Sequence, residues 1–393
     1  MKKKMLCLAL ACAMCLVGCG ETEKKVVEEI NVTETEQQPY EKIELPLPDS
    51  LLVENAQGSD YIGDDFEGYV ADPMGKPAVY YSTYTREYEE YYGTVTRWQI
   101  SEENDWVSEE LCEESLSRYL NTKFEQNEWT KCSLSSFRRG DNGSLYGVFT
   151  YYMKETIVED EKEKEQIVPK YSLLEIDEEN DSVFEIPLLD VVGKPVEARG
   201  RNAWENELPL ISDYHVFEDG NILLVLSDNG GGMASLVDGE SGKQIQNLGN
   251  IVSGKTRFAF GESEVVMYSK TDNLFQVLSI PDMEEQNQFG TELTEEERSK
   301  DWYFHMNPNT WEMFLFNKEG VYQASNYQSG DEMELLTKGT DLSDVAEGMA
   351  TILDFYVDDE GDFYVCMMET VEEYGIKSNM YRMIRYTKQN ESK

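Results

Sequence analysis

Apolar and polar residues alternate along most of the chain from Tyr40 onward, and this pattern predicts strands rather than helices. The apolar runs are short, rich in β-branched and aromatic residues, and separated by Gly, Asn and Asp. A period of two places successive side chains on opposite faces of a strand, whereas an amphipathic helix has a period near 3.6. The sequence therefore predicts an all-β protein.

The predicted strands fall into groups of four that are joined by tight turns. The clearest group occupies residues 214–248, and similar groups begin near residues 257 and 302. Two longer groups lie upstream, at 66–108 and 131–186. Sequential four-strand units spaced by about 40 to 50 residues are typical of β-propeller blades. A β-sandwich or barrel, which also has short strands and regular turns, is the alternative.

The two ends of this repeat complement each other. The last group supplies three strands, at 352–357, 362–368 and 380–386, before the chain stops at Lys393. Near the start, residues 41–46 form an isolated strand with no group of its own. If this strand joins the last group as its outer strand, the ring closes and leaves no open edge for aggregation. We therefore expect a six-bladed propeller closed by the N-terminal strand, with seven blades as the second possibility.

Two segments interrupt the strand pattern with helical spacing. Residues 109–126 carry apolar side chains that fall on one helical face: Leu111, Leu116, Tyr119, Leu120 and Phe124. We expect this helix to pack over the rim between the first two blades. Residues 291–300 predict a shorter acidic helix, because Thr294 followed by Glu297 has the order of a capping box.

The first part of the chain has a different pattern. Three lysines precede an uncharged apolar run from Met5 to Val17, which is the order of a secretory signal. The run is shorter than the roughly 20 apolar residues that a membrane-spanning helix needs. Its end, Leu16-Val17-Gly18-Cys19, resembles the lipobox of bacterial lipoproteins. That resemblance implies that residues 1–18 are a cleaved signal peptide and that Cys19 becomes the N-terminus and carries a diacylglycerol.

The segment after Cys19 predicts a tether. Residues 19–40 are rich in Glu, Lys, Thr, Val and Gln and offer little apolar surface to bury, so they cannot offset the entropy lost on ordering. Two acyl chains are sufficient for stable membrane attachment. We therefore expect a disordered tether that holds a domain spanning 41–393 at the extracellular face of the membrane.

The charge of the chain excludes one class of partner. The formal charge is −44, and loss of the three signal lysines makes the mature chain −47. A nucleic-acid-binding protein needs a basic footprint, and the one basic pair outside the signal that stands out is Arg138-Arg139. We expect no nucleic-acid partner.

Motifs for catalysis, metals or cofactors are weak. The two histidines, His215 and His305, lie at comparable positions in their repeats and are too few for a triad or a zinc site. The Asp-rich turns do not have EF-hand spacing, and Gly and Asp are ordinary turn residues. We expect no cofactor and no metal. Paired carboxylates near the propeller axis remain an alternative basis for an enzyme.

Aromatic residues near the first blade are the candidates for ligand stacking. Tyr80, Tyr84 and Trp98 lie in a Tyr-rich stretch, and aromatic faces stack on sugars and peptides. Packing between blades is the other explanation for these side chains. Of the three cysteines beyond Cys19, Cys112 and Cys132 either pair or remain thiols, because connectivity cannot be deduced from sequence.

The order of lipobox, polar tether, isolated Ile43-Glu44-Leu45-Pro46 strand and acidic, Tyr-rich blades is similar to the propeller-like N-terminal region of Gram-positive extracellular solute-binding lipoproteins. The two-lobed solute-binding domain of that family has no counterpart before Lys393. The resemblance implies an accessory role in solute uptake or sensing, beside an ABC transport or sensor system. We therefore expect a non-enzymatic propeller that binds a protein or a glycan. The alternative is a propeller glycoside hydrolase or lyase.

Overall fold

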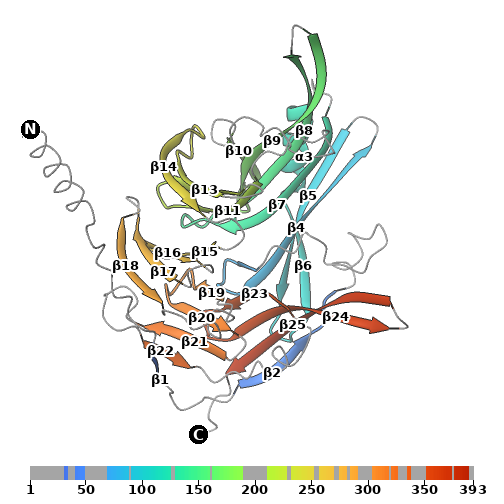
Figure 1. Ribbon diagram of the computed structural model, residues 1–393. Coiled ribbons are helices and arrows are strands. Elements are labelled where there is room, and N and C mark those ends of the chain that lie inside the picture. The colour runs from blue at the N-terminus through green and yellow to red at the C-terminus, as the bar shows by residue number, and fades with distance from the viewer. Residues whose placement is uncertain are drawn as a thin grey trace, which may run out of the picture.

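The computed structural model describes most of the chain from residue 31 to residue 388. The described residues are 31–33, 40–48, 69–87, 90–124, 129–159, 162–188, 210–227, 232–251, 256–269, 274–280, 284–290, 303–317, 320–325, 334–337, 351–373 and 376–388. They form six sheets arranged around a common axis (Figure 1). The predicted all-β, six-bladed propeller is confirmed.

Each blade is an antiparallel meander in which sequence neighbours pair along the sheet. Blade 1 consists of β3 (Val70–Ala71), β4 (Pro77–Glu87), β5 (Glu90–Ile100) and β6 (Trp106–Leu111). Blade 2 consists of β7 (Trp129–Arg139), β8 (Leu145–Glu159), β9 (Lys162–Asp177) and β10 (Ser182–Pro187). Blade 3 consists of β11 (Leu210–Val216), β12 (Ile222–Ser227), β13 (Gly232–Val237) and β14 (Gln244–Ile251). The long hairpin of β8 and β9 projects beyond the ring (Figure 1).

The second half of the ring repeats this order. Blade 4 consists of β15 (Thr256–Phe260), β16 (Glu264–Ser269), β17 (Leu274–Ser279) and β18 (Glu285–Gly290). Blade 5 consists of β19 (Tyr303–Met306), β20 (Met313–Asn317), β21 (Gly320–Ser325) and β22 (Glu334–Thr337). Blade 6 consists of β23 (Thr351–Val357), β24 (Phe363–Glu373), β25 (Ile376–Lys388) and β2 (Tyr40–Leu45).

The N-terminal strand closes the ring as predicted. Strand β2 pairs antiparallel with β25, from Tyr40 opposite Lys388 to Leu45 opposite Met383. Leu45 is 2% exposed, and the ring of Tyr40 lies 4.9 Å from that of Phe363. Because the outer strand of the last blade comes from the start of the chain, the ring is held by strand pairing as well as by packing.

A short strand lies inside the predicted tether. Strand β1 (Asn31–Thr33) runs parallel to β22 and adds a fifth strand to the edge of blade 5. This differs from the prediction that residues 19–40 are disordered. An outer edge strand presents unpaired N–H and C=O groups, which a nearby extended segment can satisfy. The rest of the predicted tether, with Cys19 and the signal peptide, lies outside the described residues.

The core is divided among the six interfaces between neighbouring blades. Each interface has its own cluster of buried apolar side chains. Alternation along one strand supplies two interfaces at once: Ile222 and Leu224 face blade 2, whereas Leu223 faces blade 4. This is why strands such as β12 are apolar on both faces, and it makes each blade depend on both of its neighbours.

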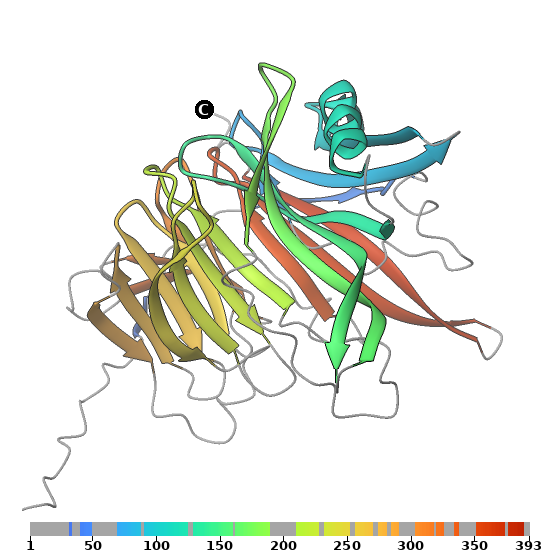
Figure 2. The same cartoon turned by 90° about the horizontal axis from the view of Figure 1, so that it is seen from above.

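The predicted helix between blades 1 and 2 is present but shorter. Helix α3 (Glu113–Phe124) begins two residues after Leu111, which belongs to β6. Its buried side chains, including Leu116 and Leu120, join the blade 1–2 cluster, and the helix lies against β5 (Figure 2). A Cβ at Gly93 would lie 2.7 Å from Leu120, so glycine is needed for this close approach. The predicted helix at 291–300 lies outside the described residues.

Candidate functional site

The innermost strands of three blades are interrupted by β-bulges. The bulge in β7 precedes Arg138, the bulge in β11 precedes Asp213, and the bulge in β23 precedes Asp354. A bulge breaks the alternation of a strand and changes the direction of the following side chain. In each of these three strands a charged residue follows the irregularity. Bulges of this kind are common next to functional sites.

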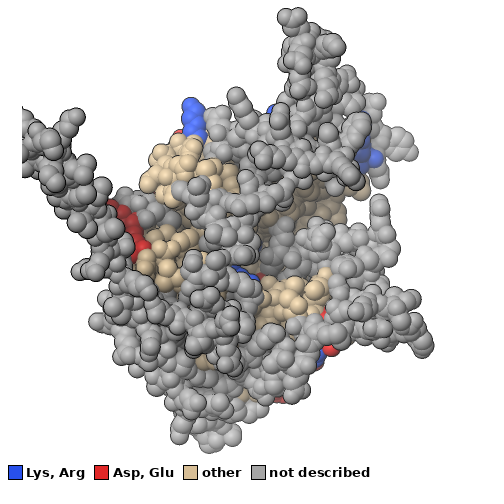
Figure 3. Space-filling view, in the orientation of Figure 1, with Lys and Arg blue, Asp and Glu red and all other residues tan. Residues whose placement is uncertain are grey.

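Five side chains from the innermost strands form what we call the axial cluster: Arg138, Asp213, Arg257, Tyr303 and Asp354. They come from blades 2, 3, 4, 5 and 6. Arg138 and Arg257 both lower the pKa of Asp354, so both act on it electrostatically. Blades 2, 4 and 6 are spaced around the ring, and these interactions therefore cross the propeller axis. In the face that Figure 3 draws, blue atoms of Lys or Arg and red atoms of Asp or Glu lie side by side near the middle.

The two acids of the axial cluster already have protein partners. The carboxylate of Asp213 lies 3.5 Å from Arg138 Nε and also accepts a hydrogen bond from the Tyr214 amide at 2.9 Å. Asp354 accepts a hydrogen bond from the amide of Tyr69 in blade 1. Burial raises the pKa of Asp354 to about 6, although the hydrogen bond from Tyr69 and the two arginines oppose that shift. Asp354 therefore links blade 6 to blade 1 at the axis.

The arginine of blade 4 is held by stacking. The guanidinium carbon of Arg257 lies 3.6 Å from the centre of the Tyr303 ring. Tyr303 stacks in turn on Phe316 at 4.8 Å, and Phe316 stacks on Phe355 at 3.9 Å. A cation over an aromatic face is stabilised by the ring quadrupole. The stack positions Arg257 through the face of its guanidinium and not through its N–H groups.

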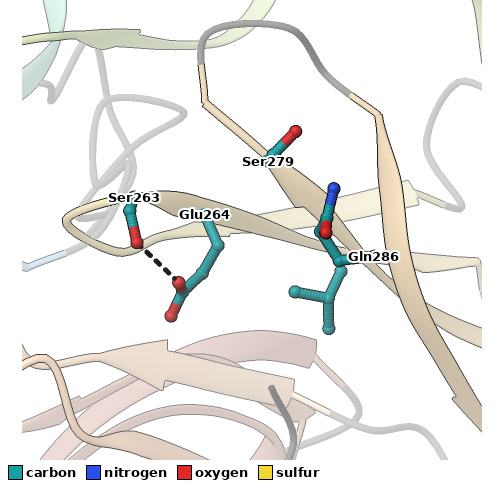
Figure 4. Close-up of a pocket in the computed structure, with 5 residues that line it drawn as sticks. Ser263, Glu264, Ser279 and Gln286 are labelled. Atoms are coloured by element: carbon teal, nitrogen blue, oxygen red, sulfur yellow. Dashed lines mark hydrogen bonds between the residues drawn. The ribbon is translucent and has the colours of Figure 1, made fainter. Parts of the chain in front are cut away.

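A second feature is a polar pocket on blade 4. It has a volume of about 270 Å³ and is lined by Ser263, Glu264, Val277, Ser279 and Gln286. Figure 4 shows Ser263 beside Glu264, and the Ser263 hydroxyl donates a hydrogen bond to the Glu264 carboxylate at 3.0 Å. Glu264 is 9% exposed, so its carboxylate is a buried acceptor at the edge of the pocket.

The turn between β23 and β24 gathers three carboxylates within 4.8 Å of one another, from Asp358, Glu360 and Asp362. Asp362 accepts hydrogen bonds from Arg385 Nε at 3.0 Å and Nη2 at 2.7 Å. Asp358 accepts from the Glu360 and Asp362 amides and from the hydroxyl of Tyr364. Burial raises the pKa of Asp358 to about 6. These contacts explain the cluster as a hydrogen-bonded turn, and we assign no metal to it.

The predicted stacking residues do not share one surface. Tyr80 and Tyr84 pack in the blade 1–2 cluster, whereas Trp98 packs in the cluster between blades 6 and 1. Tyr80 is 5% exposed, and its hydroxyl accepts a hydrogen bond from Arg139 at 2.9 Å. Trp98 lies opposite Val79 in the β4–β5 pair, one position out of phase with Tyr80, so alternation places it on the other face of the blade.

Each histidine contacts a neighbouring blade. His215 stacks on Phe260 of blade 4 at 4.3 Å, and its Nε2 lies 2.9 Å from the Asp141 carboxylate of blade 2. His305 lies 4.5 Å from the ring of Tyr356 in blade 6. Burial lowers the pKa of His305 to about 4, so it is neutral at physiological pH. Both are contacts between blades at comparable places in the repeat.

The cysteines at 112 and 132 are free thiols in the structure, as is Cys366. Burial raises the pKa of Cys112 to about 11 and that of Cys132 to about 12. A thiol with a raised pKa forms little of the reactive thiolate. These cysteines therefore contribute to packing, and little of each thiol is ionised at neutral pH.

No sequence motif predicts the axial cluster. Its members are separated by up to 216 positions, from Arg138 to Asp354, and they meet because the ring closes. The local signal is weak, because the bulges that redirect the side chains are not visible as a change in composition. Within the described residues, no helix has the length and apolar character needed to cross a bilayer.

Comparisons with known proteins name no family for the chain. No protein-family model matches the chain, and neither does any curated protein. The solved structures that resemble it include the Neurospora crassa Pan2 WD40 domain, with 10% identity, a TM-score of 0.39 and coverage of 91% of this chain and 98% of that one. The C-terminal WD40 domain of Sif2 has 10% identity, a TM-score of 0.37 and coverage of 90% and 99%.

A third similar structure is the Dos1 propeller, with 8% identity and a TM-score of 0.36. The match covers 78% of this chain and 66% of that one. The fold itself follows from the six sheets and their strand order. The chain is a six-bladed β-propeller.

Proposed function

We propose that this chain is a lipid-anchored protein of the extracellular face of the membrane, and that its propeller binds a protein or glycan ligand without changing it chemically. The observation that carries the proposal is the axial cluster, in which charged side chains from separate blades converge on the axis. The blades of a propeller surround a central channel, so side chains from several repeats can reach one ligand there.

The partners of the axial acids favour binding over hydrolysis. A glycoside hydrolase needs one carboxylic acid that donates a proton and a second carboxylate free to act as nucleophile or base. Here Asp213 is paired with Arg138, and Asp354 accepts the backbone amide of Tyr69. Both carboxylates therefore already have partners within the protein. The hydrolase or lyase alternative would need a different pair of acids.

The position of β2 supports a tethered arrangement. As the outer strand of blade 6, β2 enters the ring at its rim, and the innermost strand β23 stays at the axis. A chain leading from Cys19 to Tyr40 would therefore approach the rim and leave the axis open to a ligand. The membrane would be the first partner, through the lipid on Cys19, with an ABC transport or sensor system as the second.

A screen tests this proposal. The mature chain with Cys19→Ala would be exposed to sugars, peptides and divalent ions while thermal unfolding and product formation are measured together. We expect at least one sugar or peptide to raise the unfolding temperature and to be recovered unchanged. Formation of a product from any of these compounds would overturn the binding role and support the hydrolase or lyase alternative.

A further inference from the structure

Arg257 has hydrogen-bonding capacity that the described part of the chain does not use. Arg257 is partly exposed, and its guanidinium carbon lies 3.6 Å from the centre of the Tyr303 ring. Among the described residues, no hydrogen bond or ion pair involves its N–H groups. By contrast, Arg97 and Arg385 each bond directly to carboxylates. A guanidinium presents five donors in a planar fork that matches a carboxylate or a phosphate.

The stack fixes this fork in advance of binding. Tyr303 is itself supported by Phe316, which is fully buried, so the surface under the guanidinium is rigid. Stacking involves the flat face of the guanidinium. The N–H donors lie in the plane of the group, at its edge, and can still donate hydrogen bonds to a ligand. A preorganised arginine loses less side-chain entropy on binding than a mobile one.

The two acids of the axial cluster have hydrogen-bond or ion-pair partners other than Arg257. Arg138 and Asp213 form one pair. The remaining acid, Asp354, accepts a hydrogen bond from the Tyr69 amide, and Arg257 acts on it only electrostatically. The described acids of the axial cluster therefore leave the hydrogen-bond donors of Arg257 available to a ligand.

From this arrangement we infer that the edge of Arg257 at the propeller axis binds a carboxylate group of the ligand, with Tyr303 as the platform that orients the guanidinium. The inference rests on the proposed binding function and names the chemistry that its site recognises. A monoanion is favoured over a phosphate, because Asp213 and Asp354 lie in the same cluster and repel a dianion more strongly.

Titration calorimetry of the full mature chain tests the inference. The probes are galacturonate and an N-acetylated dipeptide, which offer the carboxylate on a sugar and on a peptide, together with galactose, the dipeptide amide and inorganic phosphate. We expect at least one carboxylate probe to bind, and its neutral counterpart and phosphate to bind at least tenfold more weakly. Which of the two probes binds identifies the source of the carboxylate.

Three variants locate the site. Arg257→Gln should weaken binding by about tenfold or more, because a charge-assisted hydrogen-bonded pair is lost. Arg257→Lys should recover only part of the affinity, since an ammonium lacks the planar fork. Arg382→Gln is the matched control, because Arg382 lies in the outer strands of blade 6, pairs with Glu44 and should not affect binding. Circular dichroism would confirm that each variant is folded.

The results separate this inference from the proposed function. If neither carboxylate probe binds, or if folded Arg257→Gln binds one as tightly as the unchanged protein, the carboxylate site is overturned. A neutral sugar or peptide that binds without change while both carboxylates fail would leave the binding function in place and remove the carboxylate assignment. Equal loss of affinity in Arg257→Gln and Arg382→Gln would also overturn it, because the effect would then be one of general charge.

Discussion

Two buried ionisable side chains affect stability in opposite directions as pH changes. The pKa of Asp354 is raised to about 6 and that of His305 is lowered to about 4, in both cases mainly by burial. Burial disfavours the charged form of each group. The Asp354 carboxyl therefore lowers the free energy of unfolding as pH rises, and the His305 imidazole lowers it as pH falls. The two effects partly cancel in the unchanged protein.

Asp354→Asn should remove the first effect. Between pH 4 and 6 the folded state binds the Asp354 proton more tightly than the unfolded state, so this group lowers stability as pH rises. The total is about 3 kcal/mol for a shift of about two units. Urea denaturation across this range should show stability increasing more steeply with pH in the variant. Asp105→Asn, at an exposed acid, is the control and should follow the unchanged protein.

His305→Phe should remove the second effect while keeping an aromatic ring against Tyr356. The folded-state pKa of His305 lies below its ordinary value of 6.5, so its contribution to stability is complete above pH 6.5 and is lost as pH falls toward 4. The same denaturation series should show less loss at low pH for the variant, by about 3 kcal/mol at most. An unchanged pH profile would show that His305 is not buried as described.

At the scale of elements, helix α3 is an example of what the sequence predicts well. The apolar spacing of Leu116, Leu120 and Phe124 identified the helix, and these residues are buried. Its start was predicted too early, because Leu111 continues the strand alternation of β6 before the chain turns at Cys112, which has a φ of 53°. The pairing of β6 with β5 determines where the helix begins, and the spacing of apolar residues along the sequence does not show it.

Leu120→Ala should destabilise the protein by about 2 to 5 kcal/mol, because Leu120 is 1% exposed and fills the space above Gly93. Thr122→Ala, on the exposed face of the same helix, should change stability by less than about 0.5 kcal/mol. Chemical denaturation measures both. Equal effects of the two variants would mean that the helix does not pack on blade 1.

At the scale of the whole molecule, the missing strand of the last repeat was sufficient to predict closure by β2. The axial cluster was not predictable in the same way. Whether Arg138, Arg257 and Asp354 meet depends on the number of blades and on bulges within β7 and β23. The aromatic residues that sequence favoured, Tyr80 and Tyr84, are instead used between blades 1 and 2. The sequence shows that these side chains can stack, but it does not show whether they stack on a ligand or on other residues of the protein.

The acidic charge also acts on the whole molecule. A formal charge of −44 repels itself in the compact state more than in the expanded unfolded chain. Raising the salt concentration from low to physiological ionic strength shortens the Debye length to about 8 Å and weakens this repulsion. We therefore expect the unfolding temperature to rise with added sodium chloride at pH 7. A decrease would mean that favourable ion pairs, such as Arg97 with Glu178, outweigh the repulsion.

The tethered propeller is tested most directly by the mass of the N-terminal peptide of the protein purified from the membrane fraction of the cells that produce it. The account predicts a mature chain that begins at Cys19 and carries a diacylglycerol on the Cys19 sulfur, with residues 1–18 removed. A mature chain that retains Met1, or that begins elsewhere without lipid, would contradict it.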